Sequence, residues 1–269
     1  CVIIMPGPPG ELAPMFNESV RGFLKKYSDG AIVSHTVNII GMGESSVAEE
    51  IEDMFDAKNP TVAPYAKSGE VRLRITAKAE TADEADKMCA PVVDEICSRL
   101  GDVVYGIDMN SIEERVVALL KEKGKKIATA ESCTAGYIPK RLTDIPGASE
   151  VFECGIVSYS NDMKTKLLGV SPKTLETYGA VSEQTAREMA LGAKRVSGAD
   201  IAISTTGLAG PGGDGVLPGG LSFAAATDGE RTVVEKIVTG HENDREYNRY
   251  VTASRALNLV RLMLEEKIK

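Results

Sequence analysis

The hydrophobic pattern in the first part of the chain switches between helical and strand periodicity. Apolar residues at helical spacing predict helices over residues 14–27, 45–55 and 82–100, the last of them capped by Thr81. Short apolar or alternating runs predict strands over residues 31–40, 61–66, 71–79 and 103–105. The order of strands and helices from residue 31 onward, β-α-β-β-α-β, predicts a small α+β domain.

Strict alternation within residues 71–79 indicates which face of this sheet is buried. The set that would face the core is Val71, Leu73, Ile75 and Ala77. The intervening basic set is Arg72, Arg74 and Lys78. A basic sheet face can bind nucleic acid, as in KH domains, but no Gly-x-x-Gly loop accompanies it. A solvated face explains these residues equally well, and we favour that interpretation.

Residues 106–110 are predicted to be a linker, and strands alternate with helices after it. Strands are expected over residues 126–130, 153–159, 200–205, 221–227 and 231–239, the last two joined by a hairpin at Asp228-Gly229. One helix is expected to begin at the capping box of Ser111–Glu114 and to end at Gly124, and a second covers residues 134–142. A short helix begins at Ser171-Pro172, a longer one extends from Ser182 to Gly198, and the last covers about 242–268. This alternation predicts an α/β fold, a three-layer α/β/α domain whose mixed sheet is covered on both faces.

The first residues of the chain have the pattern of a single strand followed by a proline- and glycine-rich segment. Residues 1–5 are predicted to be a buried strand, which runs into a Pro-Gly-Pro-Pro-Gly segment at residues 6–10. A single strand cannot bury itself, so we expect residues 1–27 to be the remnant of a domain whose sheet precedes this chain.

Composition and charge narrow the possible functions. The 269 residues include 39 acidic and 31 basic side chains, a net charge of −8, which argues against a general nucleic-acid binder. No apolar run is long enough to span a membrane, and no secretory signal pattern opens the chain. The five cysteines have no CxxC spacing, which predicts neither a disulfide framework nor a zinc site and fits the reducing cytoplasm.

A serine between a strand and a helix is the first candidate for chemistry. Ser132 follows the strand at residues 126–130 and precedes the helical pattern at 134–142. Unpaired backbone N–H groups at such a position can stabilise an oxyanion, although an N-cap is the simpler explanation of Ser132 alone. The chain has only two histidines, His35 and His241, and both are expected to have structural roles. A nucleophilic Ser132 would therefore use a lysine or tyrosine as its base.

Other residues of the second domain are predicted to meet Ser132 at the carboxyl edge of the sheet. Tyr159 ends the next strand and Lys164 begins the following helix. A desolvated Lys164 could accept the hydroxyl proton of Ser132, whereas a surface lysine and a rim tyrosine are the alternative. The glycine-rich segment at 205–215 follows a third strand and either binds an anion or forms a flexible loop.

Two arginines at the start of the last helix add a positive charge that the helix dipole disfavours. Arg245 and Arg249 lie one turn apart and would share a face. An anionic ligand would resolve this conflict, and so would a salt bridge to Asp244 or Glu246.

Taken together, these motifs resemble the CinA family of competence/damage-inducible proteins, over almost the whole chain. The segments that carry the resemblance are AESCTAG at 130–136, Tyr-Ser-Asn at 159–161 with Lys164, GAVS at 179–182, GLAGP at 207–211 and Asp244-Arg245. The segment NPTVAPYA at 59–66 is similar to the family's KH-like middle domain. The resemblance implies three parts: a remnant of a molybdopterin-binding-like domain at 1–27, a KH-like domain at 28–106 and a nicotinamide-nucleotide amidase domain at 111–269.

The resemblance implies that nicotinamide mononucleotide (NMN) is hydrolysed to nicotinate mononucleotide and ammonia, with no metal or cofactor. The implied roles are Ser132 as nucleophile, Tyr159 and Lys164 in proton transfer, and Arg245 in the site. Implied substrate-binding residues are Glu131, Cys133, Thr134, Gly136, Thr206, Gly207, Gly210, Pro211, Gly212 and Arg249. The backbone N–H groups of Cys133 and Thr134 are our candidates for the oxyanion hole. A homodimer is expected from the resemblance alone, whereas the expected cytoplasmic location rests on the cysteine usage.

Several positions depart from the family pattern. Ala135 stands where the family usually has glycine, Leu221 replaces a threonine, and residues 241–243 lengthen the loop before Asp244. The nucleotide-pyrophosphatase activity found in part of the family belongs to its N-terminal domain, so we expect this chain to lack it. The alternative functions are a non-enzymatic nucleotide-binding or scaffold protein and, less favoured, single-stranded nucleic-acid binding by the basic sheet face.

Overall fold

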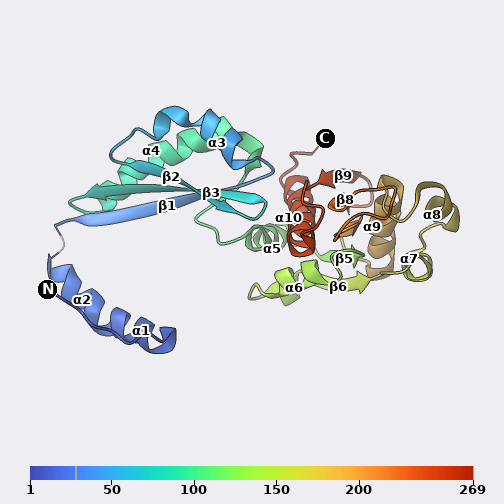
Figure 1. Cartoon of the computed structure of the whole chain (residues 1–269), viewed down its shortest axis with the longest axis horizontal. Coiled ribbons are helices and arrows are strands. Elements are labelled where there is room, and N and C mark those ends of the chain that lie inside the picture. Colours follow the sequence, from blue (N-terminus) through green and yellow to red (C-terminus); the bar gives the residue numbers. More distant parts are fainter. Residues whose placement is uncertain (28, 269) are drawn as a thin grey trace.

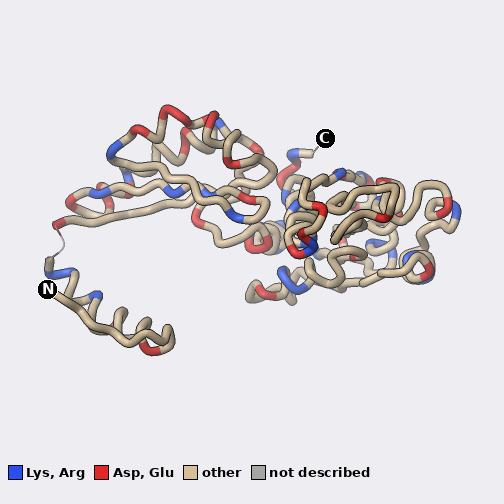
Figure 2. The backbone as a smooth tube through the Cα atoms, viewed as in Figure 1, with Lys and Arg blue, Asp and Glu red and all other residues tan. Residues whose placement is uncertain are grey.

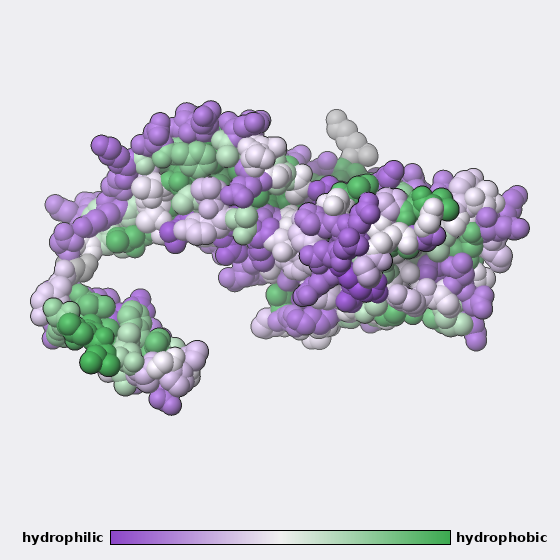
Figure 3. All heavy atoms as spheres, in the orientation of Figure 1, coloured by the Kyte–Doolittle hydropathy of each residue, from purple (hydrophilic) through white to green (hydrophobic). Residues whose placement is uncertain are grey.

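The computed structural model describes residues 1–27 and 29–268, and its first ordered element is a helical segment (Figure 1). This segment consists of α1 (Pro9–Met15), η1 (Phe16–Val20), α2 (Arg21–Leu24) and η2 (Lys25–Tyr27). Residues 1–5 pair with no strand, so the predicted strand there is wrong, and the helix begins earlier than predicted. Much of the segment's apolar surface is exposed (Figure 3). The predicted boundary at residue 28 lies outside the described residues.

The KH-like part is a four-stranded antiparallel sheet with helices on one face (Figure 1). The strand order is β2 (Thr61–Lys67), β3 (Glu70–Ala79), β1 (Ala31–Ile40) and β4 (Val104–Ile107). The helical elements are α3 (Glu44–Glu50), η3 (Glu52–Met54), α4 (Ala82–Leu100) and η4 (Gly101–Val103). The predicted helix at 45–55 is therefore two shorter pieces, while the capping box of Thr81 and Glu84 opens α4 as expected.

The alternation along β3 is confirmed, because the four apolar side chains predicted to face the core are buried. The basic residues on the other face are bound within the protein. Arg72 donates to Asn38 Oδ1 and Arg74 lies over the Tyr65 ring, while Lys78 pairs with Asp29. Acidic residues gather on the helices above (Figure 2). These contacts give all three basic side chains partners within the protein, and the preference for a solvated face over nucleic-acid binding stays a prediction.

His35 of β1 lies between two carboxylates from other elements. Its Nδ1 is 2.6 Å from Asp108 Oδ2 and its Nε2 is 2.9 Å from Asp86 Oδ1. Both nitrogens can donate only when the ring is protonated. The hydrogen bond to Asp108 is the largest of the effects that raise the pKa of His35 above its ordinary 6.5.

A raised pKa in the folded state makes stability depend on pH. The protonated ring stabilises the fold below its unfolded pKa, and this contribution is lost as the pH rises through the folded pKa. We therefore expect the free energy of unfolding to fall between about pH 6 and about pH 8, and to fall less in His35→Gln. Chemical denaturation at both pH values checks this, with His241→Gln as the matched control. Equal pH dependence in His35→Gln and the wild type would contradict it.

The second part of the chain is built on a five-stranded mixed sheet. Its strand order is β6 (Phe152–Val157), β5 (Ile127–Glu131), β7 (Ile201–Gly207), β8 (Leu221–Thr227) and β9 (Thr232–Val238). β6, β5 and β7 are parallel, whereas β8 and β9 are antiparallel. The helical elements are α5 (Ile112–Glu122), α6 (Tyr137–Thr143), η5 (Ala148–Glu150), α7 (Asn161–Leu168), α8 (Pro172–Tyr178), α9 (Glu183–Ser197) and α10 (Arg245–Leu264).

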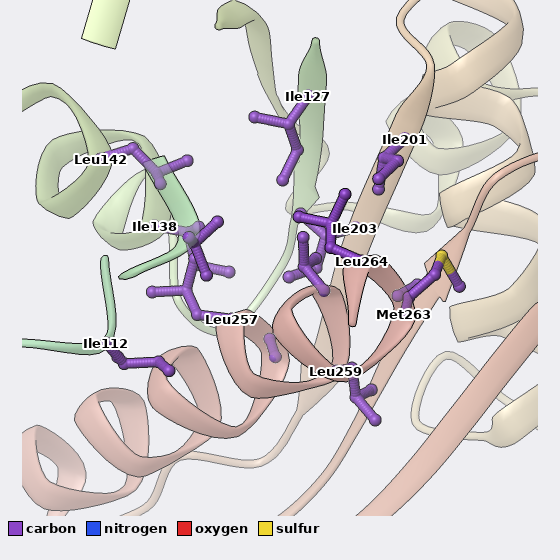
Figure 4. Packing of buried hydrophobic residues seen from close by; sticks show 14 of the residues in the cluster. Ile112, Ile127, Ile138, Leu142, Ile201, Ile203, Leu257, Leu259, Met263 and Leu264 are labelled. Carbon is purple, nitrogen blue, oxygen red and sulfur yellow. The ribbon is translucent and has the colours of Figure 1, made fainter. Parts of the chain in front are cut away.

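Both faces of this sheet are covered, which confirms the predicted three-layer α/β/α arrangement. Ile127, Ile201 and Ile203 join the cluster of buried residues that includes α5 and α10 (Figure 4). Ala130 and Ala202 pack on the opposite face with Leu168 of α7 and residues of α9. No helix among the described residues is both long and apolar enough to span a bilayer.

Helix α10 also joins the two parts of the chain. Arg261 is fully buried in it, and its guanidinium donates to Asp102 O at 2.6 Å and to Val104 O at 3.2 Å. These two carbonyls belong to η4 and β4 of the KH-like part. The hydrogen bonds therefore connect the last helix to the first sheet.

Three helix starts differ from the predictions for local reasons. Ser111 caps α5, but Glu114 accepts a hydrogen bond from the backbone of Asn110, so the reciprocal half of the predicted capping box is absent. The helix predicted from residue 134 begins at Tyr137, since residues 132–136 form turns. The last helix, predicted from about residue 242, begins at Arg245, because the Asp244 side chain caps it by accepting from Tyr247 N.

Candidate active site

Three parallel strands bring the predicted site residues to one edge of the sheet. Ser132 follows β5, Tyr159 lies just beyond the end of β6, and the glycine-rich segment follows β7. Because β6, β5 and β7 are parallel neighbours, their carboxyl ends meet at the same edge. This topology brings the three segments together, as the sequence predicted.

Ser132 and Lys164 form a buried pair at this edge. Lys164 Nζ lies 2.9 Å from Ser132 Oγ, 2.9 Å from Ser158 O and 3.1 Å from Tyr159 O. The Lys164 side chain comes from the first turn of α7 and is 1% exposed, with no carboxylate partner in the described ranges. Burial lowers its pKa, although the nearby Cys133 thiol opposes the effect. A neutral Lys164 could donate to both carbonyls and direct its lone pair at the Ser132 hydroxyl.

The turn after Ser132 presents backbone N–H groups that could bind an oxyanion. The N–H of Ser132 is used, because it donates to Thr205 O at 3.0 Å. The N–H groups of Cys133 and Thr134 donate to no carbonyl or side-chain oxygen of the residues that the structure describes. The Thr134 hydroxyl is held by Thr205 Oγ1 at 2.6 Å, which anchors the turn to β7. These two N–H groups remain our candidates for the oxyanion hole.

Ala135 lies in this turn with a φ of 49°, in the left-handed region that favours glycine. It is exposed, so no side-chain packing compensates for the backbone strain. We expect Ala135→Gly to raise the free energy of unfolding by about 0.5–1 kcal/mol. Denaturation in urea measures the change. Ala82→Gly at the start of α4, which lacks a positive φ, is the control and should lower stability. A less stable Ala135→Gly variant would contradict the assignment of strain to Ala135.

Glu131, a predicted substrate-binding residue, points toward α6. Its carboxylate is fully buried, and Oε2 accepts a hydrogen bond from Ile138 N at 3.2 Å, so it caps that helix. Burial raises the pKa of Glu131, although backbone N–H groups at the start of α6 partly oppose this effect. Gly136, with a φ of 86°, provides the N-cap backbone of α6. The geometry gives both residues a role in shaping the turn.

A cavity of about 190 Å³ opens at the turn that follows Ser132, where Cys133 reaches its lining and Ser132 itself does not. It is lined by Cys133, Tyr159, Arg245 and residues 207–213. Arg245 donates to Gly210 O at 2.8 Å and lies 3.4 Å from the Tyr159 hydroxyl. Tyr159 is 60% exposed and therefore forms the rim of the cavity. Burial raises the pKa of the Cys133 thiol to about 12, so Cys133 is a poor competing nucleophile.

The glycine-rich segment is a structured loop and forms one side of this cavity. Gly210 has a φ of 87°, and a Cβ there would lie 2.3 Å from Glu242 O. Gly212 N donates to the same Glu242 carbonyl at 3.0 Å. These contacts show an ordered loop rather than a flexible one, and the binding of a ligand by Gly210, Pro211 and Gly212 stays a prediction.

Three other predicted residues make structural contacts. The Thr206 hydroxyl donates to Ala180 O, and Gly207 packs tightly against Ser222 of β8. Arg249 donates to Thr134 O at 2.7 Å and is absent from the cavity lining. Within the described part of the chain, Arg245 and Arg249 form no ion pair, so the salt-bridge explanation for them is not observed.

Comparison with known proteins identifies the family to which this chain belongs. The family model for the CinA C-terminal domain matches residues 109–264, and the model for the damage-inducible protein CinA KH domain matches residues 34–106. The chain belongs to the CinA family.

Relatives and solved structures of the CinA family match over large parts of the chain. A Clostridium beijerinckii protein that is named as a competence-damage inducible protein is 52% identical to this chain. The match covers 90% of this chain and 60% of that protein. A CinA-like protein from Desulfovibrio desulfuricans is 45% identical over 97% of this chain and 62% of that protein. The crystal structure of the competence/damage inducible protein CihA from Agrobacterium tumefaciens is 38% identical, with a TM-score of 0.55, over 57% of this chain and 93% of that one. The chain thus spans about three fifths of the length of its full-length CinA relatives.

Sequence reasoning missed several residues that shape this CinA-type site. The Ser158 carbonyl holds Lys164, and the buried Ser158 hydroxyl has no hydrogen-bond partner among the described residues. Thr205 fixes the Ser132 turn, and Asn248 donates to Ala209 O and His241 O to join two loops. Contacts made by backbone carbonyl groups leave no sequence motif. The one signal that could have indicated Ser158 was its position directly after an apolar strand.

A second cavity, of about 470 Å³, lies between the KH-like part and the mixed sheet. Loop 41–44, hairpin 66–71, β9 and α10 line it. No serine, cysteine or histidine is among its described lining residues, so it offers no counterpart to the Ser132–Lys164 pair.

Proposed function

We propose that this chain is an amide hydrolase that converts NMN to nicotinate mononucleotide and ammonia. The observation that carries the proposal is the buried contact of 2.9 Å between Lys164 Nζ and Ser132 Oγ. A serine paired with a desolvated lysine is suited to acyl transfer, because burial lowers the pKa of the lysine and so favours the neutral amine that can act as a base. The resemblance to CinA amidase domains supplies the substrate.

The reaction would begin with neutral Lys164 accepting the proton of the Ser132 hydroxyl as Oγ attacks the carboxamide carbon. The resulting oxyanion would lie against the N–H groups of Cys133 and Thr134. The C–N bond then breaks, Lys164 returns the proton to the leaving nitrogen, and ammonia departs from an acyl-enzyme. Water gives its proton to Lys164 and attacks the ester carbon. The protonated Lys164 then returns that proton to Ser132, and nicotinate mononucleotide is released.

Arg245 would orient the substrate, and Tyr159 would assist the proton transfers of Lys164 from the rim of the cavity. Arg245 supplies a positive charge at the cavity and is held by Gly210 O, so it can meet an anionic nucleotide without an ion-pair partner to displace. Tyr159 reaches the Arg245 guanidinium from the rim. Gly210, Pro211 and Gly212 would pack against the substrate on the same side.

We also propose the division of the chain that the family resemblance implies. Residues 28–106 would be the KH-like domain, residues 111–269 the amidase domain, and residues 1–27 a remnant of a preceding domain. Residue 269 lies outside the described part of the chain.

Incubation of the wild-type chain with NMN tests the proposed function. We expect equal amounts of ammonia and nicotinate mononucleotide, measured by an enzyme-coupled assay and by chromatography. Nicotinate mononucleotide itself, which lacks the amide, is the control substrate and should release no ammonia. A folded chain that binds NMN without releasing ammonia would instead support the nucleotide-binding alternative.

A further inference from the structure

The Ser132 turn is held from outside the cavity by Arg249. Its guanidinium donates to Thr134 O at 2.7 Å, which fixes the peptide group that follows Thr134. The preceding peptide group carries the Thr134 N–H, one of the candidate oxyanion donors. Such donors are effective only when they are held in place before the charge develops. The position of Arg249 is therefore relevant to catalysis even though Arg249 does not line the cavity.

Two aromatic rings connect Arg249 to the KH-like part of the chain. The Arg249 guanidinium lies 5.6 Å from the centre of the Tyr137 ring, and Tyr137 packs edge-on against Tyr250 at 6.4 Å. The Tyr250 hydroxyl donates to Glu70 Oε1 at 3.1 Å. Tyr250 belongs to α10 and Glu70 to β3, so this hydrogen bond crosses from one sheet domain to the other.

Glu70 is a fixed anchor for this contact. Its side chain is buried, and a second tyrosine, Tyr105 of β4, donates to Oε2 at 2.8 Å. Burial and the Glu70 carboxylate raise the pKa of both tyrosines, so both hydroxyls stay protonated and act as donors. A carboxylate held on both oxygens has little freedom to move.

We propose that the KH-like domain supports the catalytic turn through the contact chain Glu70–Tyr250–Tyr137–Arg249–Thr134. Arg249, Tyr137 and Tyr250 are then positioning residues for the oxyanion donors, and Glu70 is their anchor. This proposal rests on the proposed amidase function, and it gives the KH-like domain a role in catalysis in place of nucleic-acid binding.

Two tyrosine variants provide a matched test in the full chain. Tyr250→Phe and Tyr105→Phe each remove one hydroxyl from Glu70, but only Tyr250 contacts Tyr137. Both variants should lower the melting temperature. Tyr250→Phe should also lower kcat by about 3-fold to 10-fold with KM unchanged, whereas Tyr105→Phe, which keeps the hydrogen bond between Tyr250 and Glu70, should lower kcat by less than about 2-fold. Equal kcat values in the two variants would overturn the proposal, because the hydroxyl would then contribute only to stability.

A double variant tests whether the effect travels through Arg249. Arg249→Lys loses the planar stacking on Tyr137 and should lower kcat more than Tyr250→Phe does. If Tyr250 acts through Arg249, adding Tyr250→Phe to Arg249→Lys should lower kcat no further. Effects that multiply would mean that the two residues act independently, which would overturn the contact chain.

Labelling of Ser132 separates failure of this proposal from failure of the proposed function. A fluorophosphonate probe reacts with an activated serine and places an oxyanion-like oxygen in the same site, without any need for NMN turnover. We expect slower labelling of Ser132 in Tyr250→Phe than in Tyr105→Phe. If the wild type leaves NMN intact but labels at Ser132, only the substrate assignment fails. Equal labelling rates in the two variants would overturn the contact chain whatever the substrate.

Discussion

Ser132→Ala is expected to abolish ammonia release from NMN, with a fall in kcat of roughly 10⁶-fold, the size seen when the nucleophile of a serine hydrolase is removed. The Ser132 hydroxyl is the oxygen that Lys164 Nζ holds, and the N–H groups of Cys133 and Thr134 follow it in the chain. Without it no acyl-enzyme can form, and only the binding site and the oxyanion donors remain. Ammonia release measured over long incubations at high enzyme concentration gives the residual rate.

The substitution should leave the fold unchanged, since Ser132 is small and its backbone N–H still donates to Thr205 O. Ser45→Ala, an exposed serine on α3, is the matched control and should retain full activity. Ammonia release by folded Ser132→Ala at a rate near that of the control would place the nucleophile elsewhere.

Lys164→Met should lower kcat by about 10²-fold to 10⁴-fold, the range of a lost general base. Methionine fills the volume of the lysine stem but cannot accept a proton. The wild-type kcat/KM should rise with pH as Lys164 loses its proton, because only the neutral amine can act as a base. Since burial lowers the pKa of Lys164, the midpoint of this rise should lie below the ordinary 10.5. The pH profile of Lys164→Met should lack this rise.

Lys166→Met is the control for Lys164, because Lys166 is an exposed lysine on the same helix. It should keep both the wild-type rate and the wild-type pH profile. If the rise of kcat/KM with pH persisted in Lys164→Met, another group would be the base, and the role assigned to the buried lysine would be wrong.

The strands and the convergence of the site were accessible from the sequence because both depend on periodicity and topology. Alternation fixed the buried face of β3, and short apolar runs located β5, β6 and β7. Parallel strands place the residues that follow them at one edge, so the meeting of Ser132 with Lys164 follows from the strand order. The Ser-Lys pairing was therefore predictable only on the condition that β5 and β6 are neighbours, and the structure supplies that condition.

The direction in which each side chain points was not predictable in the same way. Glu131 and Arg249 lie in the expected segments, but one caps α6 and the other bonds Thr134 O. Both contacts depend on the turn at residues 132–136, whose positive φ at Ala135 has no signal in the apolar pattern. The contact between Glu70 and Tyr250 joins residues of different domains, and local periodicity carries no information on such a pair.

The strand predicted at residues 1–5 shows a different limit. The apolar composition of this segment fits a strand, but a strand forms only where another strand supplies hydrogen-bond partners. The described part of the chain offers none to these residues, which are largely exposed.

The acyl-enzyme is the most direct test of the account. The wild-type chain would be mixed with NMN, quenched in acid during turnover, digested and examined by mass spectrometry with fragmentation that separates Ser132 from Cys133. The Ser132–Lys164 mechanism predicts an acyl group derived from nicotinate mononucleotide in ester linkage to Ser132, and its absence from Ser132→Ala. An acyl group on Cys133, or on any residue other than Ser132, would contradict it.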